Sequence, residues 1–358
     1  MRVDRRTFNR LVWSVAAAGT VATGGAAARH GERDGRTDDD PQGDGGRRGG
    51  ARVRRRAETL VAIPGELTPE NLALGPDGDL FFGITAGQVR RVDRETALTA
   101  SDLSLDDTDL VATLPAAAGV ESTPEGVLYV AVNAGEDTGV WTIPVDGDDP
   151  SQYVPFTPGV FVNDLVFDPD GDRLLVTESF GGVVYEVPVG PGGAPLEGVV
   201  ATEWLASDLL DTPEFGANGL AFRGEEEVIV AVTRATSASA ADVGRLVSVP
   251  VEDDGSAGDP ETLLESAAVF GADGITVRDG SVWVAANWRN ELVRVPPSGA
   301  PVVVADDADG LVFPSDVVFG ETAGREGGSG SEGAGGPAFV CNFAVSDPDA
   351  AGILRLRP

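Results

Sequence analysis

Residues 163–176 read NDLVFDPDGDRLLV, and this stretch decides the fold. A polar start is followed by an apolar alternation, a Pro-Asp-Gly turn and a second apolar run, which is the pattern of a β-hairpin. Residues 70–82, ENLALGPDGDLFF, repeat it. Shorter copies begin at Asn218, Asp273 and Ser315, and a weaker copy, STPEGVLYV at 122–130, has its lead position near Ala118. The chain therefore carries six copies of one unit.

The spacing of the copies indicates which repeat architecture they build. They start 48, 45, 55, 55 and 42 residues apart, which suits four-stranded blades. Third apolar runs follow at 88–92, 140–143, 183–187, 245–249 and 291–295. We predict an all-β fold over residues 57–358, a six-bladed β-propeller of four-stranded antiparallel blades, closed by an N-terminal strand at 58–63. Residues 321–336, rich in Gly, Ser and Glu, are expected to form a flexible insert in the last blade.

The first 56 residues belong to no blade. Residues 1–28 combine Arg5 and Arg6, then Phe8, with an apolar stretch and a small-residue ending, which resembles a twin-arginine export signal. Residues 29–56 are rich in Arg, Gly and Asp and are expected to form a disordered tether. We therefore expect the protein to be exported, to the cell surface or the medium.

The charge balance of the chain is extreme. It has 26 basic residues, all arginine, against 58 acids, and 13 of the arginines lie in residues 1–56. The propeller region thus carries 51 acids against 13 arginines, a balance that concentrated salt would screen and that indicates a halophilic protein. Such a surface repels phosphate, so we expect neither nucleic-acid binding nor membrane contact by the propeller. Nothing in the pattern indicates an oligomeric state.

Missing residue types exclude several kinds of chemistry. The single histidine, His30, lies in the tether, and the chain has no lysine. This excludes Ser-His-Asp and Cys-His catalysis, Schiff-base chemistry and histidine-ligated zinc in the propeller. The single cysteine, Cys341, cannot form an internal disulfide and is expected to be a small buried apolar residue. Carboxylates, amides, hydroxyls and a bound metal remain.

The blade geometry places polar residues at the centre. The first strand of a blade is innermost and antiparallel to the second, so strand-one starts and strand-two ends share a face. The predicted ring at one channel mouth comprises the lead residues Glu70, Asn163, Asn218, Asp273 and Ser315, with the strand-two ends Asn133, Glu178, Thr233, Asn287 and Asn342 behind them. These oxygens suit one divalent cation, calcium more than magnesium. The alternative is that Asn and Asp at these positions only cap strands or form Asx turns.

At these residues the chain resembles the senescence marker protein/gluconolactonase family, also called regucalcin-like, over about residues 57–358. The order Glu, Asn, Asn, Asp in blades 1, 3, 4 and 5 is that of the family's site. The resemblance implies that Glu70, Asn218 and Asp273 bind the metal and that Asp273 is the catalytic base in opening a lactone. Asn163 is implied to face the small-molecule substrate, and Asn287 is expected beside it.

One departure from the family concerns the substrate. Family members that act on sugar lactones carry an arginine two residues before Asn163, where this chain has Phe161. Together with Trp288 and Phe343, which follow second strands, Phe161 predicts a more apolar mouth. Phe161 is therefore included among the expected substrate-binding residues, although such aromatic side chains often belong to the core.

Two other classes of propeller remain as alternatives. The segment NWRNELVRV at 287–295 also resembles the repeats of NHL-type propellers, which bind a partner or small ligand without catalysis. A purely structural repeat would keep one lead residue type, whereas in this chain it differs between blades. Paraoxonase-like and strictosidine-synthase-like propellers also use a central calcium, but their extra helices and catalytic histidine have no counterpart in this sequence.

Overall fold

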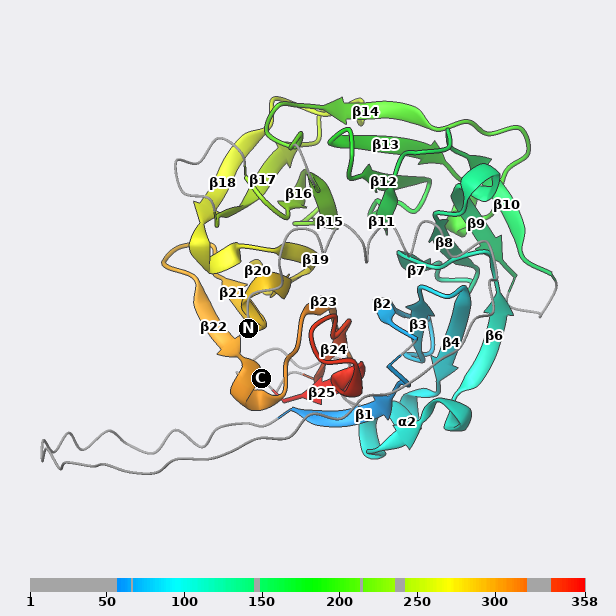
Figure 1. The fold of residues 1–358 in the computed structure, drawn as a ribbon. Helices are drawn as coiled ribbons and strands as arrows, with labels where there is room; N and C mark the ends of the chain where they lie inside the picture. The colour runs from blue at the N-terminus through cyan, green and yellow to red at the C-terminus, as the bar shows by residue number, and fades with distance from the viewer. Residues whose placement is uncertain are drawn as a thin grey trace, which may run out of the picture.

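The structure is a computed structural model that describes residues 57–65, 67–144, 149–212, 215–235, 242–320 and 336–357. Within these ranges, six sheets stand radially around a central axis, as Figure 1 shows. The protein is therefore a six-bladed β-propeller, as the repeat predicts. The expected signal at 1–28, the tether at 29–56 and nearly all of the insert at 321–336 lie outside the described residues.

The first three blades each hold four strands, which follow one another from the axis outward. Blade 1 contains β2 (Pro69–Leu74), β3 (Leu80–Ile84), β4 (Gln88–Val92) and β6 (Asp109–Thr113). Blade 2 contains β7 (Val120–Ser122), β8 (Leu128–Val132), β9 (Gly139–Ile143) and β10 (Ser151–Pro155). Blade 3 contains β11 (Val162–Phe167), β12 (Arg173–Glu178), β13 (Val183–Pro188) and β14 (Thr202–Ala206).

The other three blades continue round the ring. Blade 4 contains β15 (Ala217–Phe222), β16 (Glu227–Val232), β17 (Gly244–Pro250) and β18 (Glu261–Ser266). Blade 5 contains β19 (Ala272–Arg278), β20 (Ser281–Ala286), β21 (Glu291–Val295) and β22 (Val302–Ala305). Blade 6 contains β23 (Pro314–Phe319), β24 (Ala338–Asn342), β25 (Gly352–Leu356) and β1 (Glu58–Ala62).

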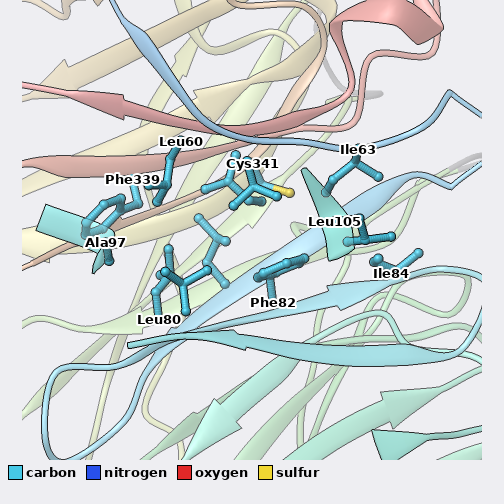
Figure 2. Packing of buried hydrophobic residues seen from close by; sticks show 13 residues of the cluster. Leu60, Ile63, Leu80, Phe82, Ile84, Ala97, Leu105, Phe339 and Cys341 are labelled. Atoms are coloured by element: carbon cyan, nitrogen blue, oxygen red, sulfur yellow. The ribbon is translucent and has the colours of Figure 1, made fainter. Parts of the chain in front are cut away.

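Blade 6 is completed by the N-terminal strand, as predicted. β1 pairs antiparallel with β25, with Glu58 opposite Arg355, and this joins the two ends of the described chain. Beyond the prediction, a short strand β5 (Leu103–Ser104) pairs parallel to β1 and adds a fifth strand to the sheet. Leu60 of β1 is buried with Phe82 and Phe339 in a core between blades 6 and 1, which Figure 2 shows. Ring closure therefore rests on both strand pairing and apolar burial.

One short α-helix interrupts the otherwise all-β architecture of the described residues. α2 (Arg94–Thr99) precedes β5 and is capped by Asp93, whose side chain accepts a hydrogen bond from the Thr96 amide. Among the described residues, none of the helices has the length and apolar character needed to cross a membrane. Cys341 is fully buried in the core of blades 6 and 1, as expected.

The hairpin turns between first and second strands fix which face holds the lead residues. Gly78 and Gly171 have positive φ values of 81° and 69°, and each amide bonds the carbonyl three residues earlier, that of Gly75 or Asp168. The two Pro-Asp-Gly segments are therefore tight turns. They lie at the far ends of the inner strands from Glu70 and Asn163, so turns and lead residues occupy opposite faces of the ring.

Candidate functional site

A cavity of about 70 Å³ lies at the mouth of the channel on the lead-residue face. Four of the predicted lead residues line it together, although they come from four blades: Glu70, Asn163, Asn218 and Asp273. Two predicted strand-two ends, Thr233 and Asn287, line it as well. The structure thus brings the implied metal-binding and substrate-facing residues to one place.

The lead residues are turned toward the axis by a recurrent β-bulge. In blade 3, Val162 pairs with Glu178 and Leu165 pairs with Val176, so β11 has one residue more than β12 between these pairs. The extra residue falls at Asn163 and its successor. The same extra residue occurs at the start of β2, β15, β19 and β23. A bulge leaves a residue unpaired and redirects its side chain, which explains how residues at strand starts come to line a cavity.

Glycines behind the lead residues let neighbouring blades approach closely. A Cβ atom added at Gly219 would overlap the backbone oxygen of Asp273, and one added at Gly274 would overlap the Asp316 carboxylate. Gly119 stands in the same relation to the Asn163 carbonyl, to which its amide donates at 2.9 Å. The innermost strands are therefore packed backbone to backbone, which narrows the channel below the cavity.

In blades 1 and 3, the residue after the lead residue is polar and links neighbouring inner strands. The buried Asp164 accepts hydrogen bonds from the Leu220 amide in blade 4 at 3.1 Å and from the Asn71 side chain in blade 1 at 3.2 Å. Asn71 follows Glu70, and Leu220 lies two residues after Asn218. Asp164 therefore links the strands that carry two of the implied metal-binding residues.

Blade 6 supplies the matching brace across the ring closure. Asp316 accepts a hydrogen bond from the Leu72 amide of β2 at 2.8 Å. The Ser315 hydroxyl donates to the Glu70 carbonyl oxygen at 2.6 Å. Ser315, predicted to join the ring, thus holds the backbone of Glu70 in place.

Asp273 has the environment expected of a base near neutral pH. Its side chain is 7% exposed, and its Oδ2 atom accepts a hydrogen bond from Asn287 Nδ2 at 2.7 Å. Burial raises the pKa of Asp273 from 3.8 to about 7, although hydrogen bonds from Asn287 and Asn218 oppose the rise and the charge of Asp164 adds to it. Without a bound cation, the carboxyl group is therefore partly protonated at pH 7, and a cation beside it would lower this pKa and favour the carboxylate that a base requires.

Glu70 is the second carboxylate of the cavity. Burial raises its pKa well above the usual value, and the charges of Asp273, Asp164 and Asp316 raise it further. Among the described residues, four buried side-chain atoms have no hydrogen-bond partner: Glu70 Oε2 and Asn287 Oδ1, and, away from the cavity, Asp309 Oδ1 and Arg355 Nε. Buried oxygens without partners are rare, and the first two atoms belong to side chains that line the cavity.

These oxygens fit a hard divalent cation. Carboxylate and amide oxygens are the ligands that calcium takes, and a cation would satisfy Glu70 Oε2 without a proton. Within the described parts of the chain, no three His, Cys, Asp or Glu side chains are grouped closely enough for a metal. A cation in this cavity would therefore combine the two carboxylates with amide oxygens, which matches the donor set of Glu70, Asn218 and Asp273.

Two amides are held in fixed orientations. Asn163 Nδ2 donates to the Ser179 hydroxyl at 2.9 Å, and Ser179 donates to the Ala217 carbonyl oxygen at 2.6 Å. Asn218 Nδ2 donates to the Thr233 hydroxyl at 3.0 Å. Because one amide hydrogen of each is engaged, its side chain presents a defined edge to the cavity.

The remaining strand-two ends satisfy backbone groups and do not line the cavity. Asn133 exchanges two hydrogen bonds with the backbone of Val162, and Glu178 accepts from three backbone amides at 2.7–3.0 Å. Asn342 likewise bonds three backbone groups. These three residues therefore cap strands and do not contribute to the cavity, as in the alternative interpretation of the polar positions.

Phenylalanines form the apolar wall of the cavity. Phe161 lines it, as predicted from its position before Asn163, and so do Phe343 and the unpredicted Phe215 and Phe313. Trp288 contacts Phe313 but does not line the cavity. A sequence signal exists for the two residues that were missed: like Phe161, each lies two or three positions before a lead residue.

A larger groove of about 740 Å³ lies on the opposite face, between blades 3 and 4. Its walls include ten carboxylates and one arginine, Arg173, which pairs with Asp168 and Glu186. None of the lead residues lines it. We assign the chemistry to the smaller cavity because it combines convergent amides, a carboxyl group with a pKa near 7 and oxygens without partners.

Comparisons with known proteins place the fold. A family model described as strictosidine synthase-like, N-terminal, matches residues 56–92, which hold β1 to β4. No curated protein matches the chain. Regucalcin from Agrobacterium tumefaciens, a calcium-binding protein, has a similar structure, with a TM-score of 0.58 and 15% identity over 85% of this chain and 95% of that one.

Two enzymes have structures of comparable similarity. A gluconolactonase from Xanthomonas campestris has a TM-score of 0.57 and 15% identity, covering 85% of this chain and 89% of its own. A PQQ-bound aldose sugar dehydrogenase from Streptomyces coelicolor has a TM-score of 0.56 and 16% identity, covering 85% and 96%. The expected resemblance to regucalcin and gluconolactonase is thus confirmed for the fold. Since one fold carries such different activities, the site must decide the function.

Proposed function

We propose that this protein is a cation-dependent hydrolase that opens a lactone or a related ester, with Asp273 as the general base. The observation that carries the proposal is the convergence of Glu70, Asn163, Asn218 and Asp273 from four blades on one cavity. The fold similarity to a gluconolactonase and to a calcium-binding regucalcin supports it.

The cation-binding part of the proposal rests on oxygen donors. Glu70, Asn218 and Asp273 would hold one divalent cation, with calcium expected from the carboxylate and amide donors. When bound, the cation would polarise the substrate carbonyl and lower the pKa of a neighbouring water.

The residues of the chain would then act as follows. Asp273, oriented by Asn287, accepts a proton from the water whose oxygen attacks the carbonyl carbon. The carbon–oxygen bond of the ring breaks, and the proton passes from Asp273 to the departing alkoxide, which gives a hydroxy acid. Asn163, oriented by Ser179, donates a hydrogen bond to the ester oxygen. The cavity of about 70 Å³ holds the reacting group and a few waters, so the rest of a larger substrate extends toward the opening.

We further propose that the protein is exported and works in concentrated salt. The arginine pair and apolar stretch within residues 1–28 support export. The excess of acids over arginines in residues 57–358 supports adaptation to salt.

A hydrolysis assay with matched carboxyl variants tests the proposed function. The full chain, in molar salt, is assayed against a panel of five- and six-membered lactones before and after removal of divalent cations with a chelator. We expect hydrolysis that calcium restores and that Asp273→Asn abolishes. Glu121→Gln is the control, because this carboxyl group also lies on an inner strand but does not line the cavity.

Two outcomes would contradict the proposal. Hydrolysis that survives in Asp273→Asn would reject Asp273 as the general base, and the lack of hydrolysis in a wild-type protein that binds calcium would reject the hydrolase. The second outcome would favour the non-catalytic NHL-like propeller, in which the same cavity only binds a ligand.

A further inference from the structure

Two groups of aromatic rings stand on opposite sides of the polar floor of the cavity. On the side of blades 3 and 4, Phe161, Phe180 and Phe215 contact one another, with ring centroids 5.3–5.6 Å apart. Phe161 and Phe215 line the cavity, whereas Phe180 is 38% exposed. The group therefore forms a continuous apolar surface from the cavity to solvent.

The second group belongs to blades 5 and 6. Phe270 stacks on Trp288 with centroids 5.9 Å apart, Trp288 meets Phe313 at 5.7 Å, and Phe313 meets Phe343 at 6.1 Å. Phe161 directly precedes β11 and Phe313 directly precedes β23, and these strands lie across the ring from each other in Figure 1. The two groups thus face each other over the cavity.

Phe313 is held in a strained backbone conformation. Its φ angle is +48°, a region that bulky side chains rarely occupy. The Phe313 amide donates to Asn290 Oδ1 at 2.8 Å, and its carbonyl oxygen accepts from the Phe343 amide at 3.2 Å. Asn290 itself has a φ angle of +56°. Strain of this kind persists where the surroundings enforce it and is concentrated at ligand-binding sites.

The lining of the cavity disfavours a charged or polyhydroxylated substituent. No arginine or histidine lines it, and the sequence has no lysine. Apart from the six residues already placed there, Thr85 is its one polar lining residue. Substrate hydroxyl groups that met the phenylalanine rings would lose their hydrogen bonds to water without gaining new ones.

We infer that the substrate carries an apolar substituent, aliphatic or aromatic, which packs between Phe161 and Phe313 while its ester group lies on the polar floor. This inference rests on the proposed hydrolysis and names its substrate class. A substituent too long for the cavity continues over Phe180. The protein is then an esterase or lactonase for hydrophobic substrates, not one for sugar lactones.

Matched lactones test this inference in the full chain with calcium. The probes are γ-butyrolactone, γ-decalactone, which adds a hexyl group to the same ring, and glucono-δ-lactone. We expect kcat/KM to be highest for γ-decalactone, by about tenfold or more. Phe161→Ala should lower kcat/KM for γ-decalactone about tenfold, mainly through KM, while changing that for γ-butyrolactone less than about threefold. Phe161→Leu should retain most of the preference.

Phe319→Ala is the control, since Phe319 lies at the far end of β23 and does not line the cavity. It should leave the ratio between the lactones unchanged. We call the space between Phe161 and Phe313 the apolar slot. A preference for glucono-δ-lactone, or an equal loss on all three probes in Phe161→Ala, would overturn the apolar slot while leaving the hydrolase in place.

Calorimetry with 5-hexyl-2-pyrrolidinone, the lactam matched to γ-decalactone, separates binding from catalysis. Lactam binding that Phe161→Ala weakens, without hydrolysis of any lactone, would reject the hydrolase and support the slot. Failure of the wild type to bind the lactam would overturn the slot.

Discussion

The strained conformation of Phe313 predicts an inverted order of stability for two truncations. Phe313→Ala and Phe313→Gly both remove a ring that is 7% exposed, which costs about 3–5 kcal/mol of unfolding free energy. Alanine keeps the positive φ of 48° and its cost of about 1–2 kcal/mol, whereas glycine adopts this region without strain. Because glycine gives back part of this gain in chain entropy, we expect Phe313→Gly to be about 1 kcal/mol more stable than Phe313→Ala.

Urea unfolding in constant molar salt measures this difference. Phe161 provides the control pair, since it is 8% exposed, lines the same cavity and is not among the residues with positive φ. There the usual order should hold, with Phe161→Ala more stable than Phe161→Gly by about 0.5–1 kcal/mol. If Phe313→Ala were as stable as Phe313→Gly, the backbone at this position would carry no strain, and the structural argument for a ligand-facing role of Phe313 would fail.

Three further outcomes follow from the channel. Burial raises the pKa of Asp164 to about 6 and that of Asp273 to about 7, so the folded state binds protons that the unfolded state has released. The cation-free protein should therefore lose unfolding free energy as pH rises from 5 to 8. Urea unfolding with a chelator should show a smaller loss of unfolding free energy over this pH range in Asp273→Asn than in wild type. Gly219→Ala should weaken calcium binding at least about tenfold in calorimetry, because its Cβ overlaps the Asp273 backbone. In the control Gly224→Ala, alanine is strained by a φ of +76°, but the residue is exposed and the new Cβ meets no neighbour, so calcium affinity should not change. Equal losses of calcium affinity in the two variants would contradict the close packing at Gly219. Ser179→Ala, which removes the hydrogen-bond partner of Asn163, should lower kcat for the best lactone with calcium affinity unchanged; an unchanged kcat would count against the role of Asn163.

Much of the fold could be predicted from the sequence because each blade repeats one local pattern. The alternation and the Pro-Asp-Gly turns locate inner hairpins such as 163–176, and the third strands at 88–92 and 291–295 match β4 and β21 to the residue. The closing strand was predictable because the last blade lacks an outer strand in the C-terminal part of the sequence, and an N-terminal strand can pair with its exposed edge. The parallel pairing of β5 with β1 was not, since it depends on two residues without a distinctive pattern.

The site was predictable only in part, for a geometric reason. The position of a residue at the start of an inner strand shows that it lies near the axis, which was enough to group Glu70, Asn218 and Asp273. Whether a strand-two end reaches the cavity depends on contacts between blades, which a repeat does not encode. Asn287 bonds Asp273, whereas Asn342 bonds backbone groups.

The buried acids behind the lead residues were missed for the same reason. In the sequence, Asp164 is one more polar residue beside Asn163, and strict alternation would turn it away from the axis. The β-bulge breaks that alternation, and the close approach of blade 4 makes its amide a partner for this carboxylate.

The most direct test of the account is a calorimetric titration of calcium into the metal-stripped full chain in molar salt. Wild type, Asp273→Ala and the control Glu121→Gln are compared. We expect one calcium site in wild type and in Glu121→Gln and none in Asp273→Ala, and we expect lactone hydrolysis in the first two proteins but not in Asp273→Ala. If Asp273→Ala bound calcium as tightly as wild type, or wild type bound none, the lead residues would be strand caps and the cavity would not be a metal site.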